Sequence, residues 1–162
     1  MKRLLPVLVG FVVLLLSSTE GWSADFQKGL AAAQRGDFVT ALREWKPLAE
    51  QGDARAQYNL GQMYRQGLGV PQDYKTAVKW YRLAAEQGDA DAQYNLGFMY
   101  HEGKGVIQDN VYALIWWNVA ASQGVRNATK NRDILAKKMT PADISKAQRL
   151  AQKCAKKSYK GC

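Results

Sequence analysis

The chain has 162 residues, a formal net charge of +9 at neutral pH, 47% hydrophobic residues and two cysteines. Linkers and low-complexity tracts are absent, and the 138 residues that follow position 24 are the size of one domain with a continuous core. These features exclude a chain of several tethered domains. The positive charge makes anionic polymers, lipid headgroups and nucleic acid the partners to be considered.

The first segment, residues 1–24, is predicted to be a signal peptide. Lys2 and Arg3 precede an apolar run, residues 4–16, that is shorter than the roughly 18 residues a membrane-spanning helix needs. Small residues suited to cleavage lie between positions 21 and 24, and the alternative is an N-terminal anchor that is not cleaved. We therefore expect the mature protein to be periplasmic or secreted.

Residues 25–51 are expected to form a first pair of helices. Ala41, Trp45 and Ala49 have the spacing of the second helix of a motif that recurs twice further along the chain. The loop before that helix is shorter than in the later copies. This segment is therefore a partial copy of the motif, as the end unit of a repeat array requires.

The next two segments, 52–87 and 88–123, are copies of one motif at an offset of 36 residues, with 21 identities in 36 positions. A fixed period of this length indicates stacked supersecondary units, none of which can bury its apolar face alone. Ala56, Leu60 and Met63 mark one face of a helix, and Gly67 then ends it. Asp73 is suited to cap a second helix. The repeat therefore predicts an all-α solenoid of αα-hairpins.

The C-terminal part is expected to close this solenoid. Residues 124–139 form a divergent unit that lacks the repeated core, and residues 140–162 are predicted to be a basic capping helix and tail. Thr140 and Pro141 are typical of a helix start. Cys154 and Cys162 are expected to pair in an oxidising compartment.

The repeated motif resembles a known family. Its elements Leu-Gly-x-Met-Tyr, Gly-x-Gly-Val and Ala-Ala-x-Gln-Gly are similar to the Sel-one-like repeat, a relative of the tetratricopeptide repeat. The match is specific over residues 52–124 and weaker on either side. The resemblance implies a right-handed superhelix that serves as a scaffold or adaptor in exported bacterial proteins and binds partner proteins on its concave face.

A row of side chains on the first helices is predicted to line that concave groove and to bind a partner protein or peptide. Successive residues of a helix are turned by about 100°, so when Leu60 faces the core these side chains point away from it. Tyr58 and Tyr94 are repeated, so packing between units is the alternative for them, whereas the non-repeated Gln62 and Phe98 are the better candidates for specificity. The candidate groove residues are Arg55, Tyr58, Gln62, Arg65, Asp91, Tyr94, Phe98 and His101.

A basic patch is predicted in the last 37 residues, which contain 11 Lys and Arg against 2 Asp and Glu. Such a patch could tether the protein to peptidoglycan or anionic lipid, and a merely solvated charged face is the alternative. Nucleic acid is not expected as a partner, because the chain is predicted to be exported. The patch residues are Lys130, Arg132, Lys137, Lys138, Lys146 and Arg149.

Catalysis is not expected. His101 is the only histidine and has no second ligand at a metal-binding spacing, so neither a metal nor a cofactor is predicted. Some cysteine-rich relatives of the repeat have been linked to β-lactam binding or hydrolysis, which makes a β-lactamase-like hydrolase a further alternative. Those relatives carry a cysteine pair in every repeat, whereas this chain has one pair and no Ser-x-x-Lys motif.

Overall fold

The computed structural model describes residues 26–162, which contain helices and turns but no strand. The predicted signal peptide lies outside these residues. None of the helices within 26–162 is long and apolar enough to cross a membrane. The helical elements are residues 26–34, α2 (Phe38–Glu50), α3 (Ala54–Gln66), α4 (Tyr74–Ala85), α5 (Ala90–Glu102), α6 (Asn110–Ser122), α7 (Arg126–Ala136) and α8 (Pro141–Lys156).

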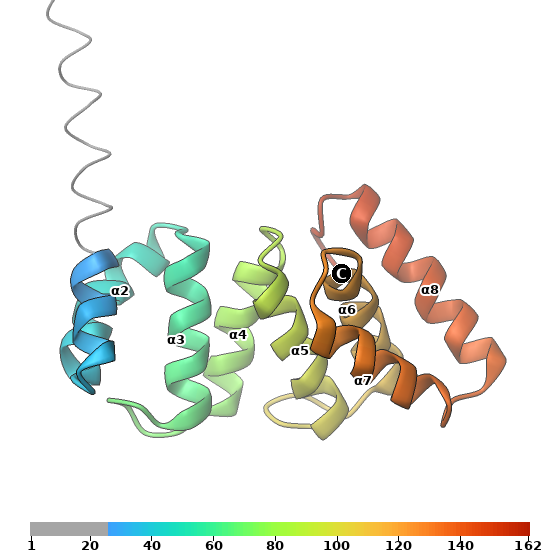
Figure 1. Ribbon diagram of the computed structural model, residues 1–162, viewed down its shortest axis with the longest axis horizontal. Coiled ribbons are helices and arrows are strands. Elements are labelled where there is room, and N and C mark those ends of the chain that lie inside the picture. The colour runs from blue at the N-terminus through green and yellow to red at the C-terminus, as the bar shows by residue number, and fades with distance from the viewer. Residues whose placement is uncertain (1–25) are drawn as a thin grey trace, which may run out of the picture.

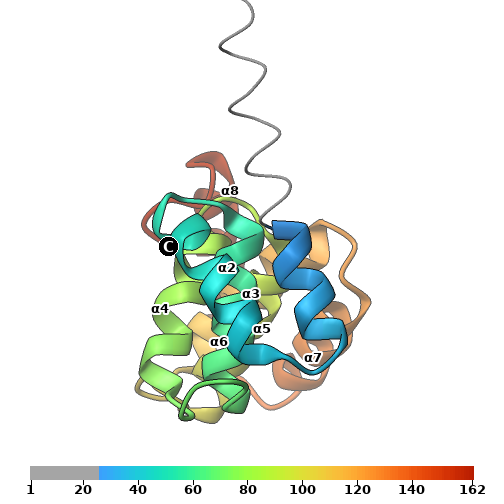
Figure 2. The same cartoon turned by 90° about the vertical axis from the view of Figure 1, so that its left-hand side faces the viewer.

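The helices stack side by side along the long axis of the molecule (Figure 1). Each helix from α2 to α6 packs on the next one in the chain. Viewed along the stack, α4 and α6 lie on one side, and the segment 26–34 and α7 on the other (Figure 2). The prediction of an all-α solenoid of helical hairpins is therefore confirmed.

A glycine in each first helix lets an aromatic ring of the second helix approach the backbone. A Cβ atom built at Gly61 would lie 2.6 Å from the Tyr81 ring, and one at Gly97 would lie 2.6 Å from Trp117 Cδ1. Trp45 takes the same position against Gly29 in the first pair. Tyr81 and Trp117 are almost completely buried as a result. These contacts set the spacing within each hairpin.

Helix ends in the two full units follow the predicted pattern. Gly67 and Gly103 adopt left-handed conformations directly after α3 and α5, with φ of 72° and 65°. The Asp73 and Asp109 side chains accept hydrogen bonds from the first backbone amides of α4 and α6. These aspartates satisfy amides that would otherwise lack partners at the start of each second helix.

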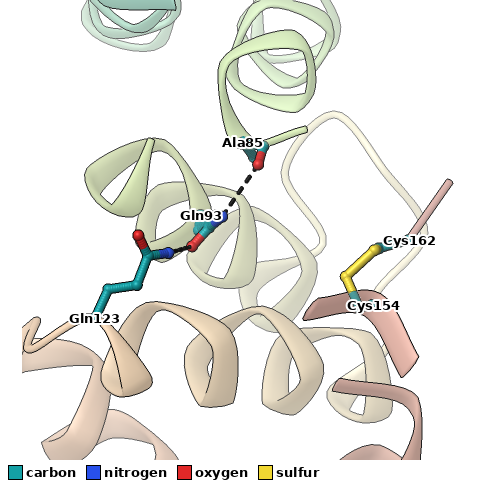
Figure 3. The surroundings of a disulfide bond; sticks show 5 residues. All are labelled: Ala85, Gln93, Gln123, Cys154 and Cys162. Carbon is teal, nitrogen blue, oxygen red and sulfur yellow. Dashed lines mark hydrogen bonds between the residues drawn. A yellow bond between two sulfur atoms is a disulfide. The ribbon is translucent and has the colours of Figure 1, made fainter. Parts of the chain in front are cut away.

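Glutamine pairs join each hairpin to the next. Gln93 Nε2 donates to the Ala85 carbonyl at 3.0 Å, and Gln123 Nε2 donates to Gln93 Oε1 at 2.6 Å (Figure 3). Gln57 and Gln87 make the same two bonds one repeat earlier. Because Gln93 is fully buried, its amide needs these partners, and the pairs fix the register between units.

The last two helices depart from this regular stacking. Both α7 and α8 pack on α6 but make little contact with each other. Asp133 stands 36 residues after Gly97, so α7 lacks the glycine that admits a ring in the earlier hairpins. The predicted disulfide is confirmed: Cys154 and Cys162 are bonded with their Cα atoms 5.6 Å apart at the end of α8 (Figure 3).

Candidate functional site

Equivalent positions of α3, α5 and α7 form one row across the first helices. All three helices begin at the same point of the 36-residue period, so Gln62, Phe98 and Ile134 correspond. All three side chains are at least partly exposed. The row changes from polar on α3 to apolar on α5 and α7, and this change defines the candidate site.

On α3 the predicted groove residues are tied into a closed hydrogen-bond network. Gln62 Nε2 donates to the Tyr58 hydroxyl at 2.8 Å, and Gln62 Oε1 accepts from the Tyr81 hydroxyl at 2.8 Å and from Arg65 Nη2 at 2.9 Å. Burial raises the pKa of the Tyr81 and Tyr58 hydroxyls, so both remain neutral at physiological pH. Few polar atoms of this network are left for a ligand.

Arg55 and Asp91 occupy the same repeat position but have different surroundings. Arg55 pairs with Asp53 at 2.8 Å, and its guanidinium lies 4.3 Å from the centroid of the Phe26 ring, so it contacts the N-terminal pair of helices. Asp91 is exposed and lies near Asp89, the N-cap of α5. Burial and the Asp91 charge together raise the pKa of Asp89.

On α5 the corresponding positions line an open pocket of about 210 Å³. Phe98 and His101 form one wall with Trp117 of α6 behind them, and α7 forms the opposite wall. The His101 and Trp117 rings lie 5.4 Å apart, and His101 Nδ1 is 2.9 Å from Asn110 Oδ1. The structure thus brings the predicted residues Phe98 and His101 together. Tyr94 adjoins them, because its hydroxyl accepts a hydrogen bond from Asn131.

The α7 wall of this pocket was missed at the sequence level. It consists of Asn131, Ile134, Leu135 and Lys138. Adding 36 to Asn95 and Phe98 gives Asn131 and Ile134, so the repeat offset could have identified them. The absence of the repeated core after residue 124 hid this correspondence. Trp117 could have been found as the counterpart of Tyr81.

Cations lie at the edge of the pocket. Lys138 lines it directly, and Lys104 Nζ lies 5.4 Å from the centroid of the Phe98 ring, within cation–π range. Glu102 lies 3.8 Å from Lys104, so part of that charge is compensated. The pocket can therefore hold a large apolar side chain with a negative group beside it.

The predicted basic patch is divided between two helices and their connection. Lys130 and Arg132 are on α7, Lys137 and Lys138 follow it, and Lys146 and Arg149 are exposed on α8. Arg132 Nε donates to Asp133 Oδ1 at 2.8 Å. No group of three or more His, Cys, Asp or Glu side chains that could hold a metal ion occurs within residues 26–162.

Comparison with known proteins identifies the repeat. The Sel1 repeat family model matches residues 54–89, 90–125 and 137–159, together more than half of the chain. No curated protein matches the chain.

Three solved structures are similar. The first is c5321, a protective antigen present in uropathogenic Escherichia coli strains that displays an SLR fold, with 32% identity and a TM-score of 0.81 over 88% of this chain and 32% of its own. A Sel1 repeat protein from Oxalobacter formigenes is 34% identical, with a TM-score of 0.64 over 66% of this chain and 44% of its own. Helicobacter pylori cysteine rich protein B shares the fold at 19% identity, with a TM-score of 0.55 over 68% of this chain and 93% of its own.

This chain thus spans less than half of the first two proteins. Sel1 repeats generally mediate protein–protein interaction, and proteins built from them are typically non-enzymatic scaffolds. From the repeated motif, the stacked helical hairpins and the family match, the chain belongs to the Sel1 repeat family.

Proposed function

We propose that this protein binds a segment of a partner protein across the face of its first helices, with a large apolar side chain of the partner in the Phe98 pocket. The observation that carries the proposal is the contrast between neighbouring units. Where α3 has a closed network of Gln62 and Arg65, α5 has Phe98 and His101 beside an open pocket. Both units keep the same backbone arrangement, so they differ in the side chains on the face of their first helices.

The pocket offers a substantial binding free energy. Ile134 is 47% exposed and Phe98 is partly exposed, although both are large apolar side chains. Burying one apolar side chain of a partner against them is worth about 1.5–3 kcal/mol, which corresponds to a factor of about 10–100 in affinity. Such a residue would act as the anchor of the interface.

We place this binding in the bacterial envelope. The predicted signal peptide supports export, and the Cys154–Cys162 disulfide is of the kind that persists in oxidising compartments. The partner is thus another periplasmic, secreted or envelope protein.

A second candidate function is a tether to peptidoglycan or anionic lipid. Lys146 and Arg149 are exposed on α8 and form no ion pair within the described chain, which favours this alternative. Tether binding is electrostatic and would weaken steeply between low and moderate salt, because exposed charges are screened. Binding in the Phe98 pocket would lose much less affinity over the same range of salt concentration.

A photo-crosslinking experiment tests the pocket proposal. A benzophenone amino acid placed at Ile134 in the native cell should capture a distinct partner, whereas the same group at Leu83, which is similarly exposed on α4, should not. Binding of the captured partner should then weaken at least tenfold in Phe98→Ser and stay unchanged in Leu83→Ser. Equal capture at both positions, or unchanged affinity in Phe98→Ser, would refute the proposal.

A further inference from the structure

A second hollow lies on the other side of α7, between α7 and α8. It consists of two adjoining cavities of about 340 and 230 Å³, which share the side chains of Asn118, Arg132 and Gln148. Helix α6 forms its floor, and α7 and α8 form its walls. The Phe98 pocket uses Asn131 and Ile134 of α7, so the two hollows lie on opposite sides of this helix. We call the second hollow the α7–α8 crevice.

The crevice is open because α7 and α8 do not pack together. In the earlier hairpins a ring of the second helix sits on a glycine of the first, but α7 has Asp133 at that position. Helix α7 is instead held on α6 by Ala128 and Leu135, its two fully buried side chains. The small residues Ala151 and Ala155 of α8 leave the space between the helices unfilled.

Several polar groups around the crevice have no protein partner. Asn118 Nδ2 is buried and lacks a hydrogen-bond partner among the described residues. The side chains of Gln148 and Gln152 also make no hydrogen bond within residues 26–162. Only Nε of Arg132 is engaged, by Asp133, which leaves its terminal nitrogens available. Buried polar groups in folded proteins are normally paired, so the Asn118 amide calls for a partner, while the exposed amides of Gln148 and Gln152 are open to a ligand.

The chemistry of these groups suits an extended peptide. A primary amide donates and accepts, as does each peptide unit, and Asn118, Gln148 and Gln152 supply three such groups in one crevice. The backbone groups of a helical partner are already paired with each other, whereas those of an extended segment are free.

The surrounding charge selects acidic segments. Arg149 and Lys156 lie about one helical turn before and after Gln152, on the same side of α8, and both are exposed. Arg132 adds a guanidinium suited to carboxylates on the α7 side. Asp133 is the one acidic side chain that lines the hollow, and it is paired with Arg132.

We propose that the α7–α8 crevice is a second binding site, which holds an extended acidic peptide segment through the amides of Asn118, Gln148 and Gln152 and through the Arg132 guanidinium. The site is independent of the Phe98 pocket. A partner with both an apolar anchor and an acidic extended segment could occupy both sides of α7 at once.

A fluorescent peptide of six Ser-Glu repeats provides the test, with six Ser-Lys repeats as the charge control. Fluorescence anisotropy should show saturable binding of the acidic peptide alone. The double variant Gln148→Ala and Gln152→Ala keeps the net charge and removes no hydrogen bond or ion pair within residues 26–162, so it should fold normally and weaken binding at least fivefold. Gln34→Ala, at an exposed position of the first helix, is the matched control and should bind like the parent.

Two further variants separate this site from the other surfaces. Ala155→Trp should fill the crevice and abolish binding, whereas Phe98→Ser should leave it unchanged. In NMR spectra the side-chain amide signals of Asn118 should shift on titration. Binding that survives in the glutamine double variant would show a general attraction between charges and would overturn the proposal, as would the absence of binding to the parent protein.

Discussion

Replacing Gly97 by alanine tests the packing principle of the fold, because two physical effects predict opposite signs. Glycine within a helix is less favourable than alanine by about 0.8–1.0 kcal/mol, so propensity alone predicts stabilisation. The new Cβ would however lie 2.6 Å from Trp117 Cδ1 and 2.7 Å from Nε1. Carbon atoms normally approach no closer than about 3.5 Å, so the ring would have to move by about 1 Å.

The cost of that movement decides the sign. Trp117 is 2% exposed, and its Nε1 donates to the Tyr94 carbonyl at 3.1 Å. Overpacking a core costs about 1–3 kcal/mol, and weakening the indole hydrogen bond costs about 1 kcal/mol more. After the gain in propensity is subtracted, Gly97→Ala should lower the free energy of unfolding by about 1–3 kcal/mol.

Urea unfolding followed by far-ultraviolet circular dichroism measures this change. With a slope of about 2 kcal/mol per molar urea, the midpoint should fall by about 0.5–1.5 M. Combining Gly97→Ala with Trp117→Phe should recover part of the loss, because the smaller ring relieves the contact. A Gly97→Ala protein as stable as the parent, or a pair of changes that simply add, would refute the role of the ring-on-glycine contact.

Three further changes in stability follow from the helix caps and the tail. Asp91→Arg should stabilise the protein by about 0.2–1 kcal/mol at pH 7, because the new arginine would pair with Asp89. Burial and the Asp91 charge raise the pKa of Asp89, so the parent protein gains stability as the pH falls through that pKa. Thermal melts at pH 7 and pH 3 should therefore show the benefit of the substitution only at pH 7. Asp53 behaves oppositely, because its burial is outweighed by its bonds to Arg55 and to backbone amides, which lower its pKa. The stability that Asp53 contributes is therefore present above the unfolded pKa of 3.8 and is lost at lower pH. Asp53→Asn should accordingly reduce the fall of the melting temperature at acid pH. Cys154→Ser should cost about 2.5 kcal/mol from the loop entropy of a nine-residue ring, measured by urea unfolding, and added reductant should then have no effect on the variant.

The repeated core could be predicted from the sequence, because identical residues at a fixed offset occupy equivalent environments. Gly61 and Gly97 are the glycines of the repeated Leu-Gly-x-Met-Tyr element, and the structure shows why each is glycine. The closed hydrogen-bond network on α3 could not be predicted from the sequence. Helical periodicity places Gln62 on the outer face, but it does not reveal that a buried tyrosine of the next helix donates to its side chain.

The C-terminal end was less predictable for a related reason. Thr140 and the cysteine pair gave the correct helix start and crosslink, because both depend on local spacing. The separation of α7 from α8 depends on what fills the space between two helices. Asp133 is visible in the sequence as a departure from the repeat, but only the packing shows that the departure opens a crevice.

The aromatic ring in the core and the outer-face residue above it differ together between the repeat with the closed network and the repeat with the open pocket. The Tyr81 hydroxyl reaches the outer face and bonds with Gln62, so that unit has a polar surface held in place. The Trp117 indole instead donates inward to the Tyr94 carbonyl, which leaves no donor on its outer edge, and Phe98, His101 and Ile134 line the face above it. Trp45 also donates inward, to the Phe26 carbonyl. Because all three rings pack on a glycine, either a tyrosine or a tryptophan can occupy this position while the backbone of the solenoid keeps its arrangement.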